Sequence, residues 1–183
     1  MNAAENSGPT GGCACGAVRF RLEAAPLVVH ACHCKNCQRQ TGAWHAVNAL
    51  LESHLVTLLR GELVHQHLST PSGAGQSVTR CALCQTAVWS NYHSFSRGHG
   101  DIVRFVRVGT LDEAWRLPPD VHIYTADRNS SAPEPVAAPR YEAFYDLPEV
   151  WAQESLRRIS ALYPPTLPGL HAATHANLTE HHP

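Results

Sequence analysis

Hydrophobic and polar residues alternate along residues 17–23, which is the pattern of a half-buried β-strand. Val18, Phe20 and Leu22 would share one face, and the charged residues 19, 21 and 23 would share the other. Residues 54–69 predict two strands with a turn near Gly61. Further strands are predicted at residues 26–30, 44–51, 76–80, 87–92, 102–108 and 121–125. The chain is therefore expected to be mainly β, with twisted antiparallel sheets.

Helical periodicity is clear only near the C-terminus. Residues 148–163 place Trp151, Leu156, Ile159 and Tyr163 roughly on one stripe, and prolines follow the stretch. The remaining segments are classed by composition: a flexible N-terminus at residues 1–11, a Pro- and Ala-rich linker at 128–139, and a tail containing proline and histidine at 164–183. A single domain is expected over residues 12–163, since 183 residues suit one domain.

Charge and hydropathy narrow the classes of partner. The formal net charge is -1, which argues against a nucleic-acid partner and gives no electrostatic attraction to an anionic membrane. No apolar run approaches the ~20 residues of a membrane-spanning helix. The first twelve residues lack the apolar core of a signal peptide. The expectation is a cytoplasmic protein. The oligomeric state is left open, a homo-oligomer included.

The seven cysteines carry the strongest chemical signal. Their number is odd and they are closely spaced, whereas a disulfide framework favours an even number in a secreted chain. Cysteines paired at C-x-C and C-x2-C spacing in a reducing compartment are typical of zinc sites. The clusters are Cys13 with Cys15, Cys32 with Cys34 and Cys37, and Cys81 with Cys84.

The spacing suggests two zinc ions, with four sulfurs on one and three on the other. Cys13, Cys15, Cys81 and Cys84 would form a closed, structural site. Cys32, Cys34 and Cys37 would form a second site with one open position, as catalytic zinc sites have. Two alternatives remain for the second site. It is a structural zinc completed by a histidine (His30, His33 or His45), or it is a set of reactive thiols without metal.

An open three-thiolate zinc favours chemistry on sulfur. Three thiolates leave the ion with a net charge of about -1 by counting, so it suits a further soft ligand better than the generation of hydroxide. A thiol that enters the open position would lose its proton and act as a nucleophile. Lys35 and Arg39, together with Arg80, would bind the carboxylates of such a thiol, or would only offset the thiolate charge and face solvent.

For other residues near the cysteine clusters, both a functional role and an ordinary structural role are considered. His33 and His45 could carry protons, although a single histidine is more often an ordinary core or surface residue. Trp44 and Trp89 could form the wall of a pocket, although packing in the core is the commoner role. Asp112 is interpreted as a turn or capping residue.

Five segments resemble the glutathione-dependent formaldehyde-activating enzyme family, also called the GFA or CENP-V/GFA domain. They are residues 12–20 (GCACGAVRF), 32–42 (CHCKNCQRQTG), 81–84 (CALC), 108–112 (VGTLD) and 121–123 (VHI). The resemblance implies a β-tent fold around two zinc ions. It also implies that Cys13, Cys15, Cys81 and Cys84 are structural ligands and that Cys32, Cys34 and Cys37 are catalytic ligands. Gln85 departs from the family, which usually has glycine at that position, and so puts the local turn geometry in question.

The leading hypothesis is a zinc-dependent carbon–sulfur lyase. It would form or cleave the adduct between a thiol and an aldehyde, which the resemblance identifies as glutathione and formaldehyde. The alternative is a non-catalytic zinc module that binds a protein or nucleic-acid partner.

Overall fold

The computed structural model describes residues 8–96, 101–134 and 138–163. Its strands are β1 (Thr10–Gly12), β2 (Arg19–Leu22), β3 (Val28–Cys32), β4 (Ala46–Glu52), β5 (Val56–Arg60), β6 (Leu63–Leu68), β7 (Gln76–Cys81), β8 (Ala87–Tyr92), β9 (Val103–Arg107) and β10 (Val121–Ile123). Its α-helices are α1 (Lys35–Thr41), α2 (His93–Ser96), α3 (Leu147–Val150) and α4 (Gln153–Ala161). Four 3₁₀ turns cover Ser53–Leu55, Val108–Thr110, Ala114–Arg116 and Thr125–Asp127. The mainly β prediction is confirmed.

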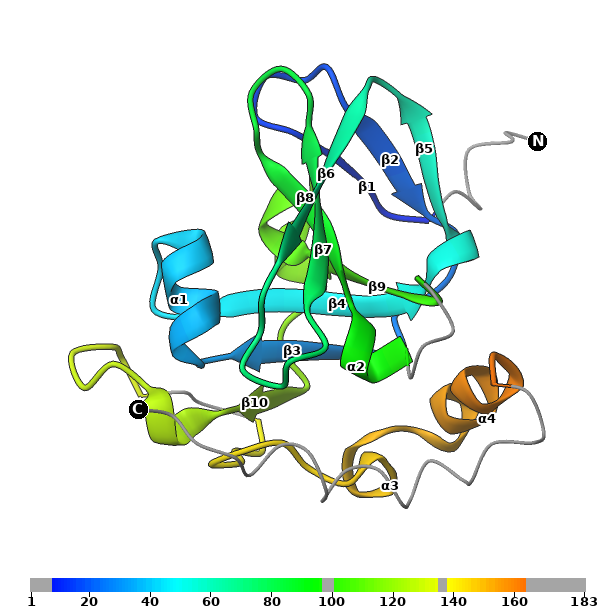
Figure 1. The fold of residues 1–183 in the computed structure, drawn as a ribbon. Helices are drawn as coiled ribbons and strands as arrows, with labels where there is room; N and C mark the ends of the chain where they lie inside the picture. Colours follow the sequence, from blue (N-terminus) through cyan, green and yellow to red (C-terminus); the bar gives the residue numbers. More distant parts are fainter. Residues whose placement is uncertain (1–7, 97–100, 135–137, 164–183) are drawn as a thin grey trace.

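The strands form two sheets (Figure 1). The larger has the order β10-β3-β4-β9-β8-β7-β6, and the smaller has the order β1-β2-β5. All neighbours are antiparallel except β10, which runs parallel to β3. The register of the larger sheet places His30 opposite Asn48, and Asn48 opposite Arg107. Residues from three distant parts of the chain therefore share one row across the sheet.

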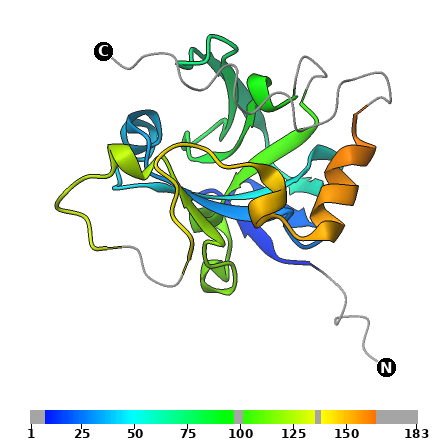
Figure 2. The ribbon, with the colours of Figure 1, turned by 90° about the horizontal axis from the view of Figure 1, so that it is seen from below.

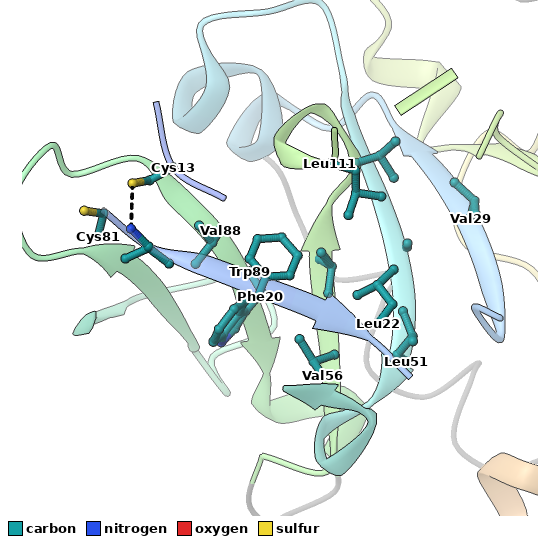
Figure 3. Close-up of a cluster of buried hydrophobic side chains, with 14 residues drawn as sticks. Cys13, Phe20, Leu22, Val29, Leu51, Val56, Cys81, Val88, Trp89 and Leu111 are labelled. Carbon is teal, nitrogen blue, oxygen red and sulfur yellow. Dashed lines mark hydrogen bonds between the residues drawn. The ribbon is translucent and has the colours of Figure 1, made fainter. Parts of the chain in front are cut away.

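The larger sheet separates two hydrophobic cores, because side chains alternate between its faces. One face carries Val29, Ala49 and Val106, which pack against the smaller sheet in a first core. Figure 3 shows the centre of this core, where the rings of Phe20 and Trp89 meet edge to face with centroids 5.6 Å apart. The prediction that Trp89 packs in the core is confirmed.

The opposite face carries the second core. Its members from the sheet include Val28, Leu50 and Phe105, and α3 and α4 contribute Leu147 and Ile159. Both helices lie along the side of β3 and β10 that faces away from the smaller sheet (Figures 1 and 2). None of the helices in the described parts of the chain has the length and apolar character needed to span a bilayer.

Three local predictions differ from the structure. Thr10 and Gly11, which the composition placed in a flexible N-terminus, form β1 together with Gly12, and this strand pairs with β2. Residues 94–101 contain the glycines and histidine that predict a loop, but α2 (His93–Ser96) takes the first three of these positions. The single helix expected at 148–163 is divided into α3 and α4, because Trp151 is extended at φ -79° and ψ 137°. That break lets the Trp151 indole enter the second core and donate a hydrogen bond to the Tyr145 hydroxyl at 2.7 Å.

The stretch expected to be a linker is tied to the domain at both of its described ends. At its start the amide of Arg128 donates to the Thr125 carbonyl at 3.1 Å, and the Arg128 guanidinium donates within the stretch to the carbonyls of Asn129 and Ala132 at 3.2 and 2.6 Å. After residues 135–137, which lie outside the described residues, the Pro139 carbonyl accepts the amide of His122 of β10 at 2.9 Å. Residues 1–7 and the tail at 164–183 also lie outside the described residues.

Candidate metal centres

The structure brings the cysteine sulfurs together in the predicted partition. Cys13, Cys15, Cys81 and Cys84 form one group and Cys32, Cys34 and Cys37 form another, and within each group all sulfurs lie within 4.8 Å of one another. Among the described residues these are the only groups of three or more metal-binding side chains with that spacing. Each group could hold a metal ion, and an all-sulfur donor set suits zinc.

The four-sulfur group joins the two sheets at one end of the first core. Cys13 and Cys15 follow β1, and Cys81 ends β7, with sulfur–sulfur distances of 3.4 Å from Cys13 to Cys15 and 3.9 Å from Cys15 to Cys81. The amide of Val18 donates to the sulfur of Cys13 at 3.2 Å, the dashed line in Figure 3. Figure 3 also shows the sulfurs of Cys13 and Cys81 side by side. This group is built from segments more than sixty residues apart.

Thr86 supports the fourth member of that group. Its hydroxyl lies 3.1 Å from the sulfur of Cys84 and accepts a hydrogen bond from the amide of Ala14 at 3.3 Å. Hydrogen bonds from the Thr86 side chain and backbone lower the pKa of Cys84 to about 5. Cys84 is thereby prepared as a thiolate, the form that binds a metal.

Gln85 adopts the backbone conformation that glycine would adopt most readily. Its φ is 61°, in the left-handed region, and its amide donates to the carbonyl of Cys81 at 3.1 Å. The guanidinium of Arg80 donates to the Gln85 carbonyl at 3.0 Å, which fastens the turn. The departure from glycine therefore leaves the turn intact, and both flanking cysteines keep their place in the sulfur group.

The three-sulfur group is built from one continuous segment at the start of α1. Cys32 is the last residue of β3, and Cys34 is the N-cap of α1, where its sulfur accepts the amide of Cys37 at 3.3 Å. Cys37 lies in the first turn of the helix and is 1% exposed. The side-chain amide of Gln38 fixes the helix further, because it donates to the carbonyls of His33 and Asp127 at 2.5 and 2.9 Å.

The three sulfurs differ in their readiness to lose a proton. Contacts with the sulfurs of Cys32 and Cys34 lower the pKa of Cys37 well below its usual value, and the positive charge of Arg107 lowers it further. Contacts with the sulfurs of Cys34 and Cys37, together with burial, raise the pKa of Cys32.

Two tyrosines lie close to this group. The hydroxyl of Tyr92 is 3.9 Å from the sulfur of Cys37. Burial, followed by the charge of Cys37, raises the pKa of Tyr92 well above its usual value. Burial, followed by the charges of the three cysteines, also raises the pKa of Tyr124. Both phenols stay protonated at neutral pH and remain hydrogen-bond donors. Neither tyrosine is distinctive in the sequence, since Tyr92 ends a strand and Tyr124 follows one.

None of the three candidate histidines joins the sulfurs as a fourth ligand within the described parts of the chain. His30 is committed elsewhere, because its Nε2 lies 2.5 Å from the Tyr145 hydroxyl, which in turn accepts the indole N–H of Trp151. Burial lowers the pKa of His30 to about 3, so its ring is neutral and accepts a hydrogen bond from the Tyr145 hydroxyl. The prediction of a three-cysteine, one-histidine site therefore has no support from this geometry.

His33 and His45 instead form a cluster with His122. Nε2 of His33 lies 3.0 Å from Nδ1 of His122, and the rings of His33 and His45 are 4.8 Å apart between centroids. Burial, with the neighbouring imidazoles, lowers the pKa of His33 to about 4. His122 was overlooked as a cluster member, although it lies in the matched segment at residues 121–123.

The remaining predicted residues lie outside the sulfur groups. Lys35 and Arg39 are both exposed on α1, and the ammonium of Lys35 donates to the Asp127 carbonyl at 2.8 Å. Trp44 is 46% exposed, so the prediction that it packs in the core is wrong. Asp112 does more than cap a turn. It accepts hydrogen bonds from the guanidinium of Arg19 and from the Thr10 hydroxyl, and so joins its own segment to β2 and β1.

Comparison with known proteins gives one family. The family model described as glutathione-dependent formaldehyde-activating enzyme matches residues 8–127. No curated protein matches the chain. A crystal structure of a protein from Rhodobacter sphaeroides is 18% identical, covers 72% of this chain and 99% of its own, and superposes with a TM-score of 0.42.

Proposed function

Because the chain belongs to the glutathione-dependent formaldehyde-activating enzyme family, we propose that it is a zinc-dependent carbon–sulfur lyase acting on the adduct of a thiol and an aldehyde. The observation that carries the proposal is the grouping of Cys32, Cys34 and Cys37 without a fourth protein ligand among the described residues. Glutathione and formaldehyde, which the family description names, are the first substrates to test.

The reaction balances without an oxidant or a reductant. In the forward direction the thiol sulfur attacks the aldehyde carbon and a carbon–sulfur bond forms. The π electrons of the carbonyl move to its oxygen, and the proton lost by the thiol ends on that oxygen. The product is the S-hydroxyalkyl thiol, and the reverse reaction releases both substrates. Zinc at the three cysteines would supply the Lewis acidity that lowers the pKa of the incoming thiol.

The residues of the chain supply the surroundings for this step. Cys32 and Cys37 are buried and Cys34 is half-buried, so the substrates would approach from the side of Cys34. The protonated hydroxyl of Tyr92, 3.9 Å from the sulfur of Cys37, offers a hydrogen bond at the buried side. Lys35 and Arg39 provide exposed positive charge on α1 for the carboxylates of a thiol such as glutathione.

The test compares two substitutions of the same ligand. Cys34→Ala removes both the metal-binding sulfur and the N-cap of α1, whereas Cys34→Ser keeps a capping oxygen and removes only the sulfur. Both variants should lose one of two zinc equivalents, and Cys34→Ser should stay folded with thermal stability nearer to that of the wild type. Both should lose adduct formation from formaldehyde and glutathione, measured against a protein-free blank.

A wild-type rate equal to the blank would refute the proposed enzyme. Unfolding of Cys34→Ser on loss of its zinc would instead favour a purely structural site, as expected of a non-catalytic zinc module. Separate substitution of Lys35 and Arg39 by alanine should raise KM for glutathione with little change in kcat, because both side chains are placed to bind and not to react.

A further inference from the structure

Arg107 is a buried cation without a carboxylate partner. It is the last residue of β9, it lies on the face of the sheet that carries the second core, and it is 7% exposed. No Asp or Glu forms an ion pair with it in the parts of the chain that the structure describes. A buried charge is costly unless an opposite charge lies nearby. The question is therefore which group compensates Arg107.

The hydrogen bonds of Arg107 direct it toward the three-cysteine group. One guanidinium nitrogen donates to Oδ1 of Asn48 at 2.6 Å, and the other donates to Oε1 of Gln40 at 3.2 Å. Gln40 lies on α1 three residues after Cys37, which puts both residues on the same side of the helix. Both acceptors are neutral amides, so they orient the guanidinium without neutralising it.

The nearby negative charge is that of the cysteines. Ala46 pairs with Cys32, and Asn48, two positions further along β4, pairs with Arg107, so Cys32 and Arg107 lie on the same face of the sheet. Three thiolates with one Zn²⁺ carry a net charge of about -1 by counting, and one guanidinium brings that sum to about zero. Lys35 and Arg39 are exposed, so water screens their charges more strongly.

We propose that Arg107 is the counter-cation of the three-cysteine metal centre, a positioning residue that is held by Asn48 and Gln40 and strengthens metal binding by Cys32, Cys34 and Cys37. The inference rests on the metal site of the proposed function, but it does not depend on which substrates are used.

The same strand contains a matched control. Arg104 is also partly buried on β9, but it lies on the opposite face, above the ring of Trp89 at 4.6 Å, and donates to the Val56 carbonyl at 2.7 Å. Arg104→Met therefore removes a partly buried cation from the face of the first core, whereas Arg107→Met removes a buried cation from the side of the three-cysteine group. Arg107→Lys keeps the charge but loses the two-pronged hydrogen bonding.

The experiment measures zinc affinity by competition with a chromophoric chelator, using the full chain loaded with two zinc ions. Cys34→Ser identifies the transition that belongs to the three-cysteine site. Arg107→Met should weaken that transition about tenfold and leave the four-cysteine transition unchanged, the size expected when a partner just outside the ligands is removed. Arg107→Lys should recover most of the loss, and Arg104→Met should leave both transitions in place.

Unchanged zinc affinity in Arg107→Met would overturn the inference, and so would an equal weakening of both sites or the same selective loss in Arg104→Met. A KM effect with intact zinc affinity would also overturn it, because it would make Arg107 a substrate-binding residue. The inference and the proposed function can fail separately. Selective zinc loss in Arg107→Met, combined with a wild-type adduct rate equal to the blank, would support the inference and refute the enzyme.

Discussion

The two sulfur groups differ in how they are built and in what surrounds them. The four-sulfur group joins segments that are distant in the sequence and connects the two sheets, yet Cys15 within it is exposed. The three-sulfur group comes from six consecutive positions and is more buried, and its neighbours are a cation and two phenols. Exposure therefore does not identify the group that we propose to be reactive. The number of sulfurs and the polar groups around them are the better guide.

The comparison predicts different consequences of losing each metal, and this is the largest effect that we expect. Cys81 is fully buried, so Cys81→Ser should break the four-sulfur site and unfold the domain. Structural zinc contributes about 10–16 kcal/mol in small peptides, whereas a whole domain is stable by about 5–15 kcal/mol. Circular dichroism and zinc content would be compared with those of Cys34→Ser, which should stay folded. A Cys81→Ser variant that melts like the wild type would remove the distinction.

A second prediction concerns the stability of the second core. This core contains Cys32 and Cys37, whereas Cys13 and Cys81 of the four-sulfur group belong to the first core. Both oxygens of buried Glu52 accept from Arg158 of α4, at 2.7 and 2.6 Å. Glu52→Gln should lower the free energy of unfolding by about 2 kcal/mol, because it leaves Arg158 without its charge partner. Urea denaturation measures this loss, and both zinc ions should be retained.

The control for this ion pair lies on the same helix. Glu154 pairs with Arg157 at 2.5 Å, but both side chains are largely exposed. Glu154→Gln should change stability by less than about 1 kcal/mol. Equal losses for the two substitutions would show that α4 is not fastened through Glu52.

A third, smaller prediction concerns pH and the smaller sheet. Hydrogen bonds from Arg19 and Thr10 lower the pKa of Asp112 to about 2, from a usual value of 3.8. A lowered pKa contributes stability that is fully present above pH 4 and lost as the pH falls toward 2. The side chains of Arg19 and Asp112 are both substantially exposed, so Asp112→Asn should lower the free energy of unfolding by only about 0.5 kcal/mol at pH 7.

Unfolding curves at pH 7 and pH 2.5 measure this effect. The difference between Asp112→Asn and the wild type should shrink at the lower pH, where the carboxylate is partly protonated. The control is Glu113→Gln, which removes an exposed pair with Arg116 and none of the contacts between strands. A difference that grows on acidification would contradict the assignment.

The smallest expected effect lies at Gln85, in the knuckle of the four-sulfur group. A left-handed conformation costs an ordinary residue about 1 kcal/mol more than glycine, and the greater freedom of glycine in the unfolded chain offsets part of the gain. Gln85→Gly should therefore raise the free energy of unfolding by about 0.5 kcal/mol. Gln85→Val should lower it, since a β-branched side chain fits that conformation poorly. Thermal melts of both variants measure these changes in stability. A Gln85→Val variant that is more stable than the wild type would exclude backbone strain at this turn.

Several strands, the grouping of the cysteines and the family could be predicted from patterns that are local in the sequence. Alternation located β2 within two residues at either end, because a strand with one buried face repeats every two positions. The segments that lead into and away from the Cys81 and Cys84 pair located β7 and β8 within one residue. The cysteine spacing gave the division into four and three sulfurs, because ligands of one ion must lie within a few ångströms of one another. The same spacing, together with the segments around it, indicated the family.

Only the tertiary structure decided which distant residues meet. Arg107 lies in the strand predicted at residues 102–108, and nothing in that prediction gave it a partner. The register of β9 against β4 places it beside Asn48, and the packing of α1 brings Gln40 to it. From the sequence, His30 was a candidate metal ligand. In the structure its ring is hydrogen-bonded to Tyr145, which lies 115 residues later in the chain. Spacing restricts neighbours along the chain, whereas partners across a sheet depend on strand order and register, which no short window of sequence contains.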